Sequence, residues 1–559
     1  MPTAPAVSSP QRPSVAYFCM EYGLDPEFTI YSGGLGILAG DHMKSCGDLR
    51  VPVTGIGILW DEGYTRQVIG TGGKIEDQYP KTSREAVQRV EGCRVTVTIK
   101  RKQVPLRAWK VTRYTSADLY LLEPEREQDR WITSRLYGGG GEDRLAQEIV
   151  LGVGGVRLLD QLGIKPDVYH FNEGHAVFAG LELLRQKKFG GGASLRDRLA
   201  KLRPHIVFTT HTPVPAGNEV HDLALMKKMD ADCGLSDEEL VALGGSPFSM
   251  TVAGLRMARI ANGVAELHGE TARHMWKDVE GAAPIISITN GVHAPSWQDA
   301  RVRAALVPDK PKDRQDAELW SAHLDMKSEL VAEIKRRTGA KVPLDGLLIA
   351  FARRAATYKR ADLILGAAAD DTKTLKKLFE RGITLVYAGK AHPRDLGGKA
   401  IVSRLVEAAK KHSRHVVFLE NYDMRLGALL TRGADVWLNN PRRPLEASGT
   451  SGMKAAMNGV PNLSILDGWW PEGCQHGVTG WKIGDVDPKD NAFDEADVAR
   501  IDKRDRDLLY RAVEKDVLPA FSNRTKWTAI MRASIAMAQW KFSSDRMVQD
   551  YQARVYSGR

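Results

Sequence analysis

One segment of the sequence, residues 446–458 (EASGTSGMKAAMN), places a carboxylate, small hydroxyl residues, two glycines and a lysine between a predicted strand and a predicted helix. The glycines let a backbone approach a ligand closely, and Ser448, Thr450 and Ser451 offer hydroxyl groups. The first N–H groups of the following helix lack partners within it and point back into the turn. The pattern predicts an anion-binding turn that suits a phosphate group.

Lys454 lies one turn into that predicted helix, among Met453, Ala455, Ala456 and Met457. Apolar surroundings disfavour the charged amine, which makes it a better nucleophile towards an aldehyde. A phosphate-binding turn beside such a lysine predicts pyridoxal 5′-phosphate held as a Schiff base. A Gly-Ser loop that caps a helix carrying a solvated lysine accounts for the same residues, and the residues alone leave both interpretations open.

A second group of basic residues lies at 351–360 (FARRAATYKR), directly after a predicted strand. The pairs Arg353/Arg354 and Lys359/Arg360 can clamp a dianion on this turn, since arginine binds phosphate oxygens in a bidentate manner. A solvated basic turn is the alternative.

Composition limits the class of protein. The chain has 559 residues, 43% of them hydrophobic, with 79 basic and 69 acidic residues spread along it and a net charge of +10. This length allows two large cores. The modest, scattered charge favours anionic substrates over nucleic acid, and no apolar run is long enough to span a bilayer, so we expect neither nucleic acid nor a membrane as a partner.

The cysteines and the first residues also carry information. Five cysteines are odd in number, far apart and free of C-x-x-C, which predicts a reduced, cytoplasmic compartment without structural zinc. Cys474 and His476 are too few to predict a metal site, and we expect none. Residues 1–13 are rich in proline and serine and predict a disordered tail.

Polar residues in the first half of the chain follow predicted strands. A strand at 15–19 leads to a glycine turn with Ser32 and Gly34 that opens a helix, which is the phosphate-binding unit of doubly wound domains, although the G-x-G-x-x-G fingerprint is absent. Glycines for tight packing are the alternative. Further polar residues after strands are Glu173 and His175 after 168–171, His211 after 204–210, and Asn290 after 286–289.

Ligands of open α/β sheets bind at the carboxyl ends of strands, so these residues are candidates for a binding site. Hydrogen-bonded packing residues are the alternative for the histidines. Residues 123–143 are charged and end in glycines 138–141, which predicts a mobile loop near the mouth of the site, or else an inert surface loop. Residues 144–162 predict one helix.

The second half alternates predicted strands and helices. Strands are predicted at 347–353, 383–389, 416–421 and 436–439, and helices at 361–369, 400–412 and 423–432. Regular alternation predicts a parallel sheet with right-handed crossovers. The predicted domains are a tail at 1–13, a first domain at 14–298, a second domain at 299–530, and a C-terminal helix at 531–559 that packs back towards the first domain.

These motifs resemble those of the α-glucan (glycogen, starch, maltodextrin) phosphorylases, whose cofactor motif reads E-A-S-G-T-x-x-M-K-x-x-x-N. The glycine turn at Gly34, the basic turn, the turns at His211 and Asn290, and the segment Y-A-G-K-A-H-P also resemble that family, over most of residues 15–530. The N-terminal regulatory extension of the long-form members has no counterpart before residue 15, and residues 467–485 resemble the short bacterial branch.

The resemblance implies an α/β fold of two Rossmann-like doubly wound domains facing across a cleft, the GT-B type. It implies reversible phosphorolysis of terminal α-1,4-linked glucosyl units, giving α-D-glucose 1-phosphate with retention. In that family the imine is a tether, and the 5′-phosphate of pyridoxal phosphate performs acid–base work beside the substrate phosphate. The implied partners are α-1,4-glucan and inorganic phosphate or glucose 1-phosphate, with a second copy of the chain in a homodimer as a candidate.

Site residues carry over position by position. The resemblance implies catalytic roles for Lys454, Arg354, Lys359 and His211; cofactor binding by Lys454, Thr450, Ser451 and Tyr422; and substrate-phosphate binding by Gly34, Arg354 and Lys359. It implies glucosyl binding by His211, Asn290, Glu446, Ser448 and Gly449, and glucan contacts by Glu173, His175 and Glu219, with no metal.

Two other functions suit the same fold. A nucleotide-sugar-dependent glucan synthase needs no aldehyde-binding lysine, so the full motif around Lys454 speaks against it. A catalytically inactive glucan-binding protein would not need intact basic and cofactor motifs.

Overall fold

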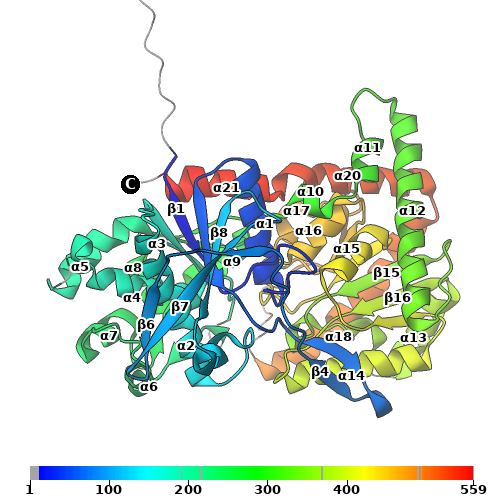
Figure 1. Ribbon diagram of the computed structural model, residues 1–559. Helices are drawn as coiled ribbons and strands as arrows, with labels where there is room; N and C mark the ends of the chain where they lie inside the picture. Colours follow the sequence, from blue (N-terminus) through cyan, green and yellow to red (C-terminus); the bar gives the residue numbers. More distant parts are fainter. Residues whose placement is uncertain are drawn as a thin grey trace, which may run out of the picture.

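Two large sheets, each covered by helices, lie side by side in the computed structural model (Figure 1). The structure describes residues 12–190, 192–214, 217–366, 369–487, 490, 492 and 494–557. The predicted fold class, α/β with two Rossmann-like doubly wound domains, is confirmed.

The sheet of the first domain has the order β14-β13-β10-β9-β1-β2-β8-β7-β5, with β6 paired to β7. Its strands are β1 Val15–Phe18, β2 Val53–Ile58, β5 Val87–Arg89, β6 Val95–Ile99, β7 Lys102–Val111, β8 Asp118–Pro124, β9 Val168–Asn172, β10 Ile206–Thr209, β13 Ile260–Gly263 and β14 Ile285–Ser287. Pairing is parallel from β14 to β8, and the β5–β7 edge is antiparallel. The strand order reverses between β1 and β9.

The sheet of the second domain has the order β17-β16-β15-β18-β19-β20 and is parallel throughout. Its strands are β15 Leu347–Ala352, β16 Ile383–Ala388, β17 Val416–Leu419, β18 Val436–Asn439, β19 Asn462–Ser464 and β20 Gly480–Lys482. This is the Rossmann order 3-2-1-4-5-6, and the reversal falls between β15 and β18.

Parallel strands covered on both faces are apolar along their whole length, and this explains the strand sequences. All residues of β1 (VAYF) and of β15 (LLIAFA) are buried.

The helices of the first domain are α1 Gly34–Asp48, α2 Gly141–Ile149, α3 Gly155–Gln161, α4 Phe178–Arg185, α5 Leu195–Leu202, α6 Leu223–Lys228, α7 Asp237–Gly244, α8 Met250–Met257, α9 Glu266–Met275 and α10 Ala294–Trp297. Those that follow are α11 Ala300–Ala305, α12 Lys312–Thr338, α13 Ala369–Glu380, α14 Leu396–Lys411, α15 Met424–Gly433, α16 Thr450–Met457, α17 Trp470–Gly473, α18 Glu495–Ala512, α19 Leu518–Phe521, α20 Arg524–Lys541 and α21 Ser544–Tyr551.

The C-terminal helices α20 and α21 run across both domains (Figure 1). Trp527 of α20 packs in the core of the second domain, whereas Tyr551 of α21 and Tyr556 pack in the core of the first. The Tyr556 hydroxyl lies 2.7 Å from Nδ1 of His170 on β9. The chain therefore leaves the second domain along α20 and completes the core of the first; the domain boundaries proposed from the sequence stay predictions.

A hairpin of β3 Arg66–Ile69 and β4 Ile75–Gln78 reaches from the first domain to the second. The Gln67 amide donates to the carbonyl of Ala391 (3.0 Å) and accepts from its N–H (2.9 Å), as a paired strand would. Asp77 forms an ion pair with Lys399 at 2.7 Å. The hairpin thus fixes the loop after β16 against the first domain.

Three predicted segments differ in the structure. In place of a helix at 361–369, the described residues form a short 3₁₀ turn at Leu363–Leu365, and α13 begins at Ala369. The predicted loop at 123–143 contains the 3₁₀ helix Glu127–Thr133, whose Ile132 is buried in the first core. The helix predicted at 144–162 begins earlier, at the start of α2, and widens to a π-helix at Val150–Gly154 before α3.

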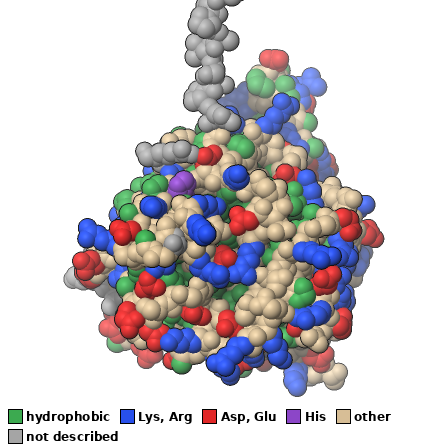
Figure 2. Space-filling view, turned by 60° about the vertical axis from the view of Figure 1, so that its left-hand side comes forward, with side chains coloured by type: hydrophobic (Ala, Val, Ile, Leu, Met, Phe, Trp, Pro, Cys, Tyr) green, Lys and Arg blue, Asp and Glu red, His purple; other side chains and the backbone are tan. Residues whose placement is uncertain are grey.

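The surface carries both signs of charge. On the face shown in Figure 2, Lys and Arg side chains lie among Asp and Glu side chains. All five cysteines are free thiols. Among the described residues, no helix combines the length and apolar character that crossing a membrane requires.

A buried ion pair of the second domain generates a stability prediction. Asp435 binds Lys327 (2.6 Å), His323 (2.8 Å) and the backbone N–H of Leu348 (2.7 Å). The side chains of Asp435, Lys327 and His323 are each 1% exposed. Asp435→Ala leaves the Lys327 charge buried without its carboxylate, so we expect a loss of about 3–5 kcal/mol in the free energy of unfolding, measured in urea by circular dichroism.

The control is Glu27→Gln, which breaks a pair with Arg425 in which both side chains are more than half exposed (74% and 66%). Such surface pairs contribute about 0–1 kcal/mol. Equal losses in the two variants would contradict the assignment of Asp435.

Candidate active site

A cavity of about 910 Å³ lies between the two domains. Part of its walls comes from residues that follow the strands flanking both reversals of strand order, β1 and β9 in the first sheet and β15 and β18 in the second. Residues that follow β10, β14, β16 and β17 line the rest. Ligands of doubly wound sheets bind at such switch points. The two switch points therefore face one shared space, which is the cleft predicted between the domains.

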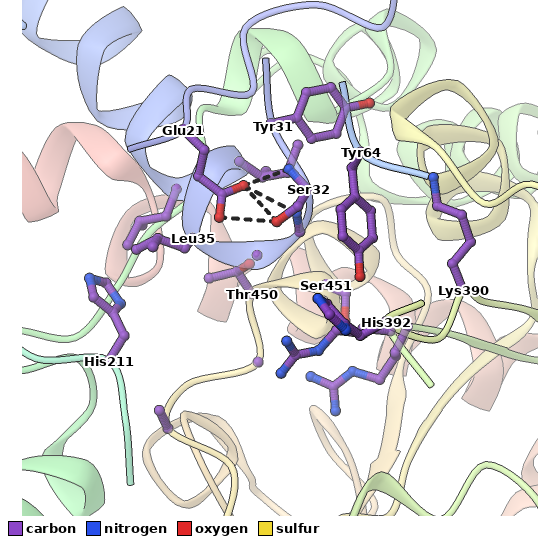
Figure 3. Close-up of a pocket in the computed structure, with 18 of the residues that line it drawn as sticks. Glu21, Tyr31, Ser32, Leu35, Tyr64, His211, Lys390, His392, Thr450 and Ser451 are labelled. Atoms are coloured by element: carbon purple, nitrogen blue, oxygen red, sulfur yellow. Dashed lines mark hydrogen bonds between the residues drawn. The ribbon is translucent and has the colours of Figure 1, made fainter. Parts of the chain in front are cut away.

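Every predicted site residue lines this cavity. From the first domain these are Gly34, Glu173, His175, His211, Glu219 and Asn290; from the second they are Arg354, Lys359, Tyr422, Glu446, Ser448, Gly449, Thr450, Ser451 and Lys454. Figure 3 shows His211 and Thr450 with Ser451 around the same space. Their shared location is a structural fact, and their individual roles remain predictions.

The glycine turn of the first domain leaves room for a ligand. A Cβ added to Gly33 or Gly34, at the start of α1, would meet nothing within 4 Å. On the opposite wall, Gly449 has a φ of 88°, which favours glycine, and it directly precedes α16. Helices α1 and α16 thus both begin at the cavity, and the partial positive charge at their N-termini favours the binding of anions there.

Several buried polar atoms at the wall of the cavity lack partners among the described residues. The hydroxyl oxygens of Ser448 and Ser451 and the side-chain oxygen of Asn290 are buried and form no hydrogen bond with any residue that the structure describes. Buried polar groups are normally paired, so such atoms at the wall of a cavity indicate groups that a ligand satisfies.

Lys454 points into an apolar corner of the cavity. Its ammonium nitrogen lies 3.4 Å from the centre of the Trp297 ring, and Met453 and Met457 flank it in the chain. Burial lowers the pKa of the Lys454 amine to about 8. A substantial fraction of the amine is therefore neutral and nucleophilic near physiological pH, as the sequence predicted.

The basic residues of the turn after β15 differ in whether a carboxylate pairs with them. Arg353 and Lys359 each lie 2.8 Å from one oxygen of Glu446, and these charges outweigh the effect of burial and lower the Glu446 pKa to about 2. Arg360 binds Asp502 and Asp505, also at 2.8 Å.

Arg354 is different. It opens onto the cavity beside Tyr64 and Tyr358, and none of the residues that the structure describes forms an ion pair with it. Of the four basic residues in this turn, Arg354 is therefore the one without a carboxylate at ion-pair distance among the described residues, although Glu21 acts on it from further away.

His211 is held by the strand end of β9. Its Nε2 lies 2.7 Å from Oδ1 of Asn172, whose amide donates to Cys19. Nε2 therefore donates, which leaves Nδ1 as an acceptor. Burial lowers the pKa of His211 to about 3, so the ring is neutral and binds through hydrogen bonds.

The three predicted glucan contacts are engaged with the protein. Glu173, with a φ of 83°, accepts from the N–H groups of Gly174 (3.0 Å) and His211 (2.7 Å). His175 accepts from the N–H of Met20 at 3.1 Å. Glu219 forms a bidentate pair with Arg144 at 2.7 and 2.8 Å.

Glu148, Glu219 and His221 come close enough together to share an ion. Arg144 lies 3.1 Å from Glu148 and already supplies positive charge to this cluster. The cluster therefore orders Arg144 at the wall of the cavity.

Comparisons with known proteins show the family of this chain. A family profile described as carbohydrate phosphorylase matches residues 296–472. The maltodextrin phosphorylase of Thermococcus litoralis is 38% identical, in an alignment that covers 97% of this chain and 70% of the relative. The chain belongs to the carbohydrate phosphorylase family.

Other family members differ in length. The glycogen phosphorylase of Mycobacterium tuberculosis is 36% identical over 97% of this chain and 70% of its own length. An uncharacterized protein of Methanocaldococcus jannaschii is 32% identical over 97% of this chain and 99% of its own.

Several residues that line the cavity were not predicted from the sequence. Glu21, Tyr64, Tyr137, Arg144 and Lys390 all line the cavity. Lys390 is half-buried, and its partial removal from water lowers its pKa to about 8. Lys390 follows β16 and Glu21 follows β1, so both carry the strand-end signal that was used for the other residues. Arg144 lies within the charged first turns of α2 and carries no such signal.

The low pKa of Lys454 predicts its reactivity. In protein freed of any carbonyl adduct with hydroxylamine, we expect reductive methylation of Lys454 to rise through a midpoint near pH 8, because only the neutral amine reacts. Lys482, whose pKa is raised by its hydrogen bond to Asp485, is the matched control and should label only at more alkaline pH. Peptide mass spectrometry measures both, and parallel labelling of the two lysines would contradict the assignment.

Proposed function

We propose that this chain is an α-glucan phosphorylase. It uses inorganic phosphate to cleave the terminal α-1,4-linked glucosyl unit of a glucan, gives α-D-glucose 1-phosphate with retention, and also runs in reverse. The observation that carries the proposal is the convergence, in one cavity, of the buried Lys454, the unpaired charge of Arg354 and the open glycine turn at Gly34. Family membership supports it, since relatives over nearly the whole chain are a maltodextrin and a glycogen phosphorylase.

Substrate phosphate binds between the two domains in this proposal. Arg354 offers a planar pair of donors, and Gly34 offers a backbone N–H at the start of α1. Lys359 keeps its ion pair with Glu446 and uses its remaining donors on the phosphate, since an ammonium group has three. These groups offset the repulsion between neighbouring anions.

The residues of the second wall fit pyridoxal 5′-phosphate. Lys454 would tether it, Tyr422 would lie beside it, and Thr450 with the unsatisfied hydroxyl of Ser451 would bind its phosphate at the N-terminus of α16. When bound, this cofactor supplies a second phosphate group for acid–base chemistry next to the substrate.

The sugar lies among polar groups that fix its orientation. His211 offers Nδ1 as an acceptor, and Asn290 and Ser448 offer their unsatisfied oxygens to glucosyl hydroxyls. Glu446, held as a carboxylate, and the backbone at Gly449 complete the glucosyl site.

A carboxylate with a pKa of about 2 is a poor general acid at neutral pH, so Glu446 does not protonate the leaving group. The proton for the departing 4-oxygen comes instead from the substrate phosphate. The phosphate oxygen then bonds to C1 of the glucosyl unit as the bond from C1 to the 4-oxygen breaks.

The glucan beyond this unit would extend towards Glu173, His175 and Glu219, whose partners keep that wall rigid. A homodimer remains a candidate assembly.

The unpaired charge of Arg354 generates a kinetic prediction. Arg354→Ala should lower kcat/KM for phosphate by a transition-state loss on the order of 2–4 kcal/mol, while glucan affinity changes little, because the lost contact is to the anion. Initial rates of glucose 1-phosphate formation at varied phosphate measure this.

The matched control for Arg354 is Arg425→Ala, at a side chain that is 66% exposed. A folded Arg354→Ala protein with wild-type phosphate kinetics would refute the role.

Lys454 generates a prediction about the cofactor. After borohydride reduction, mass spectrometry should find pyridoxal phosphate on the peptide that contains Lys454, and Lys454→Ala should lose both the adduct and most activity, because the tether positions the catalytic phosphate. Lys482→Ala should retain both. Reduced cofactor on another lysine, or active enzyme without cofactor, would show the proposal to be wrong and would reopen the glucan synthase alternative.

A further inference from the structure

A buried carboxylate lies directly behind the phosphate-binding turn of the first domain. Glu21 follows β1 and is 2% exposed. Its Oε2 accepts from the N–H of Ser32 (2.6 Å), the hydroxyl of Ser32 (2.9 Å) and the N–H of Gly33 (3.3 Å). Figure 3 shows Glu21 and Ser32 joined by these bonds at the edge of the cavity.

The second carboxylate oxygen reaches a different segment. Oε1 of Glu21 accepts from the hydroxyl of Tyr137 at 2.7 Å, and Tyr137 is 116 positions away in the sequence. Tyr137 has a φ of 56°, and its ring packs 5.1 Å from the guanidinium of Arg144. Glu21 thus joins three parts of the first domain: β1, the turn before α1 and the segment before α2.

The backbone is shaped around this carboxylate. A Cβ at Gly36 would lie 2.5 Å from Oε2 of Glu21, so any larger residue at 36 would displace it. Gly33 and Gly34, by contrast, face open space. The turn is therefore packed tightly on the side of Glu21 and open on the side of the cavity.

The hydrogen bonds also decide which N–H groups remain for a ligand. The N–H groups of Ser32 and Gly33 are taken by Glu21, and the first bond within α1 runs from the N–H of Ile37 to the carbonyl of Gly33. Gly34 is the first residue of α1, so its N–H belongs to the group that a helix leaves unpaired. Glu21 therefore holds the turn through the N–H groups of Ser32 and Gly33. The N–H of Gly34 is left to bind a ligand in the cavity.

A carboxylate close to an anion site needs a structural reason, because it repels the ligand. Four donors disperse its charge here, and both oxygens are used, which a single amide oxygen cannot do. We propose that Glu21 is a positioning residue for substrate phosphate: it fixes the turn before α1 so that the N–H of Gly34 faces the phosphate, and Tyr137 secures it. The inference rests on the proposed function for the identity of the anion.

The experiment compares Glu21→Ala, Glu21→Gln and Tyr137→Phe with the control Glu27→Ala, an exposed residue in the same segment. We expect Glu21→Ala to raise KM for phosphate about 10- to 100-fold with glucan KM within about 2-fold, and Tyr137→Phe to raise it about 2- to 5-fold. Glu21→Gln keeps one acceptor and should fall between them. Glu27→Ala should match the wild type.

Hydrogen exchange tests the positioning without relying on activity. In Glu21→Ala, amides of a peptide spanning residues 28–38 should exchange at least about 10-fold faster, while a peptide spanning 101–110 should not change. If Glu21→Ala does not fold, Glu21→Gln and Tyr137→Phe give the same two readouts.

Three outcomes would overturn the inference: unchanged exchange at 28–38, faster exchange with unchanged phosphate KM, or an equal rise of KM for glucan and for phosphate. A wild-type protein without any phosphorolysis would instead overturn the proposed function, and the exchange result would still report on Glu21.

Discussion

The site depends on one topological constraint: each sheet reverses its strand order once, and the two reversals face each other. In a doubly wound sheet the loops on either side of the reversal diverge, which leaves a crevice at the carboxyl ends of the strands. Here the segments after β1, β9, β10 and β14 on one side, and after β15, β17 and β18 on the other, bring every predicted site residue to one cavity. The helix termini that begin there, at α1 and α16, give both walls an affinity for anions.

Within that frame, pairing of charges decides which groups stay reactive. Arg353 and Lys359 are neutralised in part by Glu446, and Arg360 by Asp502 and Asp505. Arg354 keeps its charge for a ligand, and Lys454 is placed against Trp297 without a carboxylate within ion-pair distance among the described residues. Most of the cations around this cavity therefore have fixed internal partners, and few remain for a ligand.

Much of the fold and of the site location could be predicted from the sequence, because the information is local. Continuous apolar runs such as β15 specify buried parallel strands, and residues directly after them, such as His211 and Arg354, must lie at strand ends. The predicted helix at 361–369 was wrong, since apolar spacing over a few residues does not distinguish a helix from the packed 3₁₀ turn found there. The partners of Glu21 and Glu219 could not be predicted either, because they lie 116 and 75 positions away along the chain.

The bond between Tyr556 and His170 has a consequence for how the protein is made. These residues are 386 positions apart, and Tyr551 and Tyr556 fill the core beneath the first sheet. Domains generally fold in order as the chain is synthesised. Here the first domain emerges from the ribosome with part of its core uncovered, and the second domain has been translated before α21 covers it. We therefore expect the first domain to be synthesised first and finished last, with a period during translation when its exposed apolar surface needs protection from aggregation.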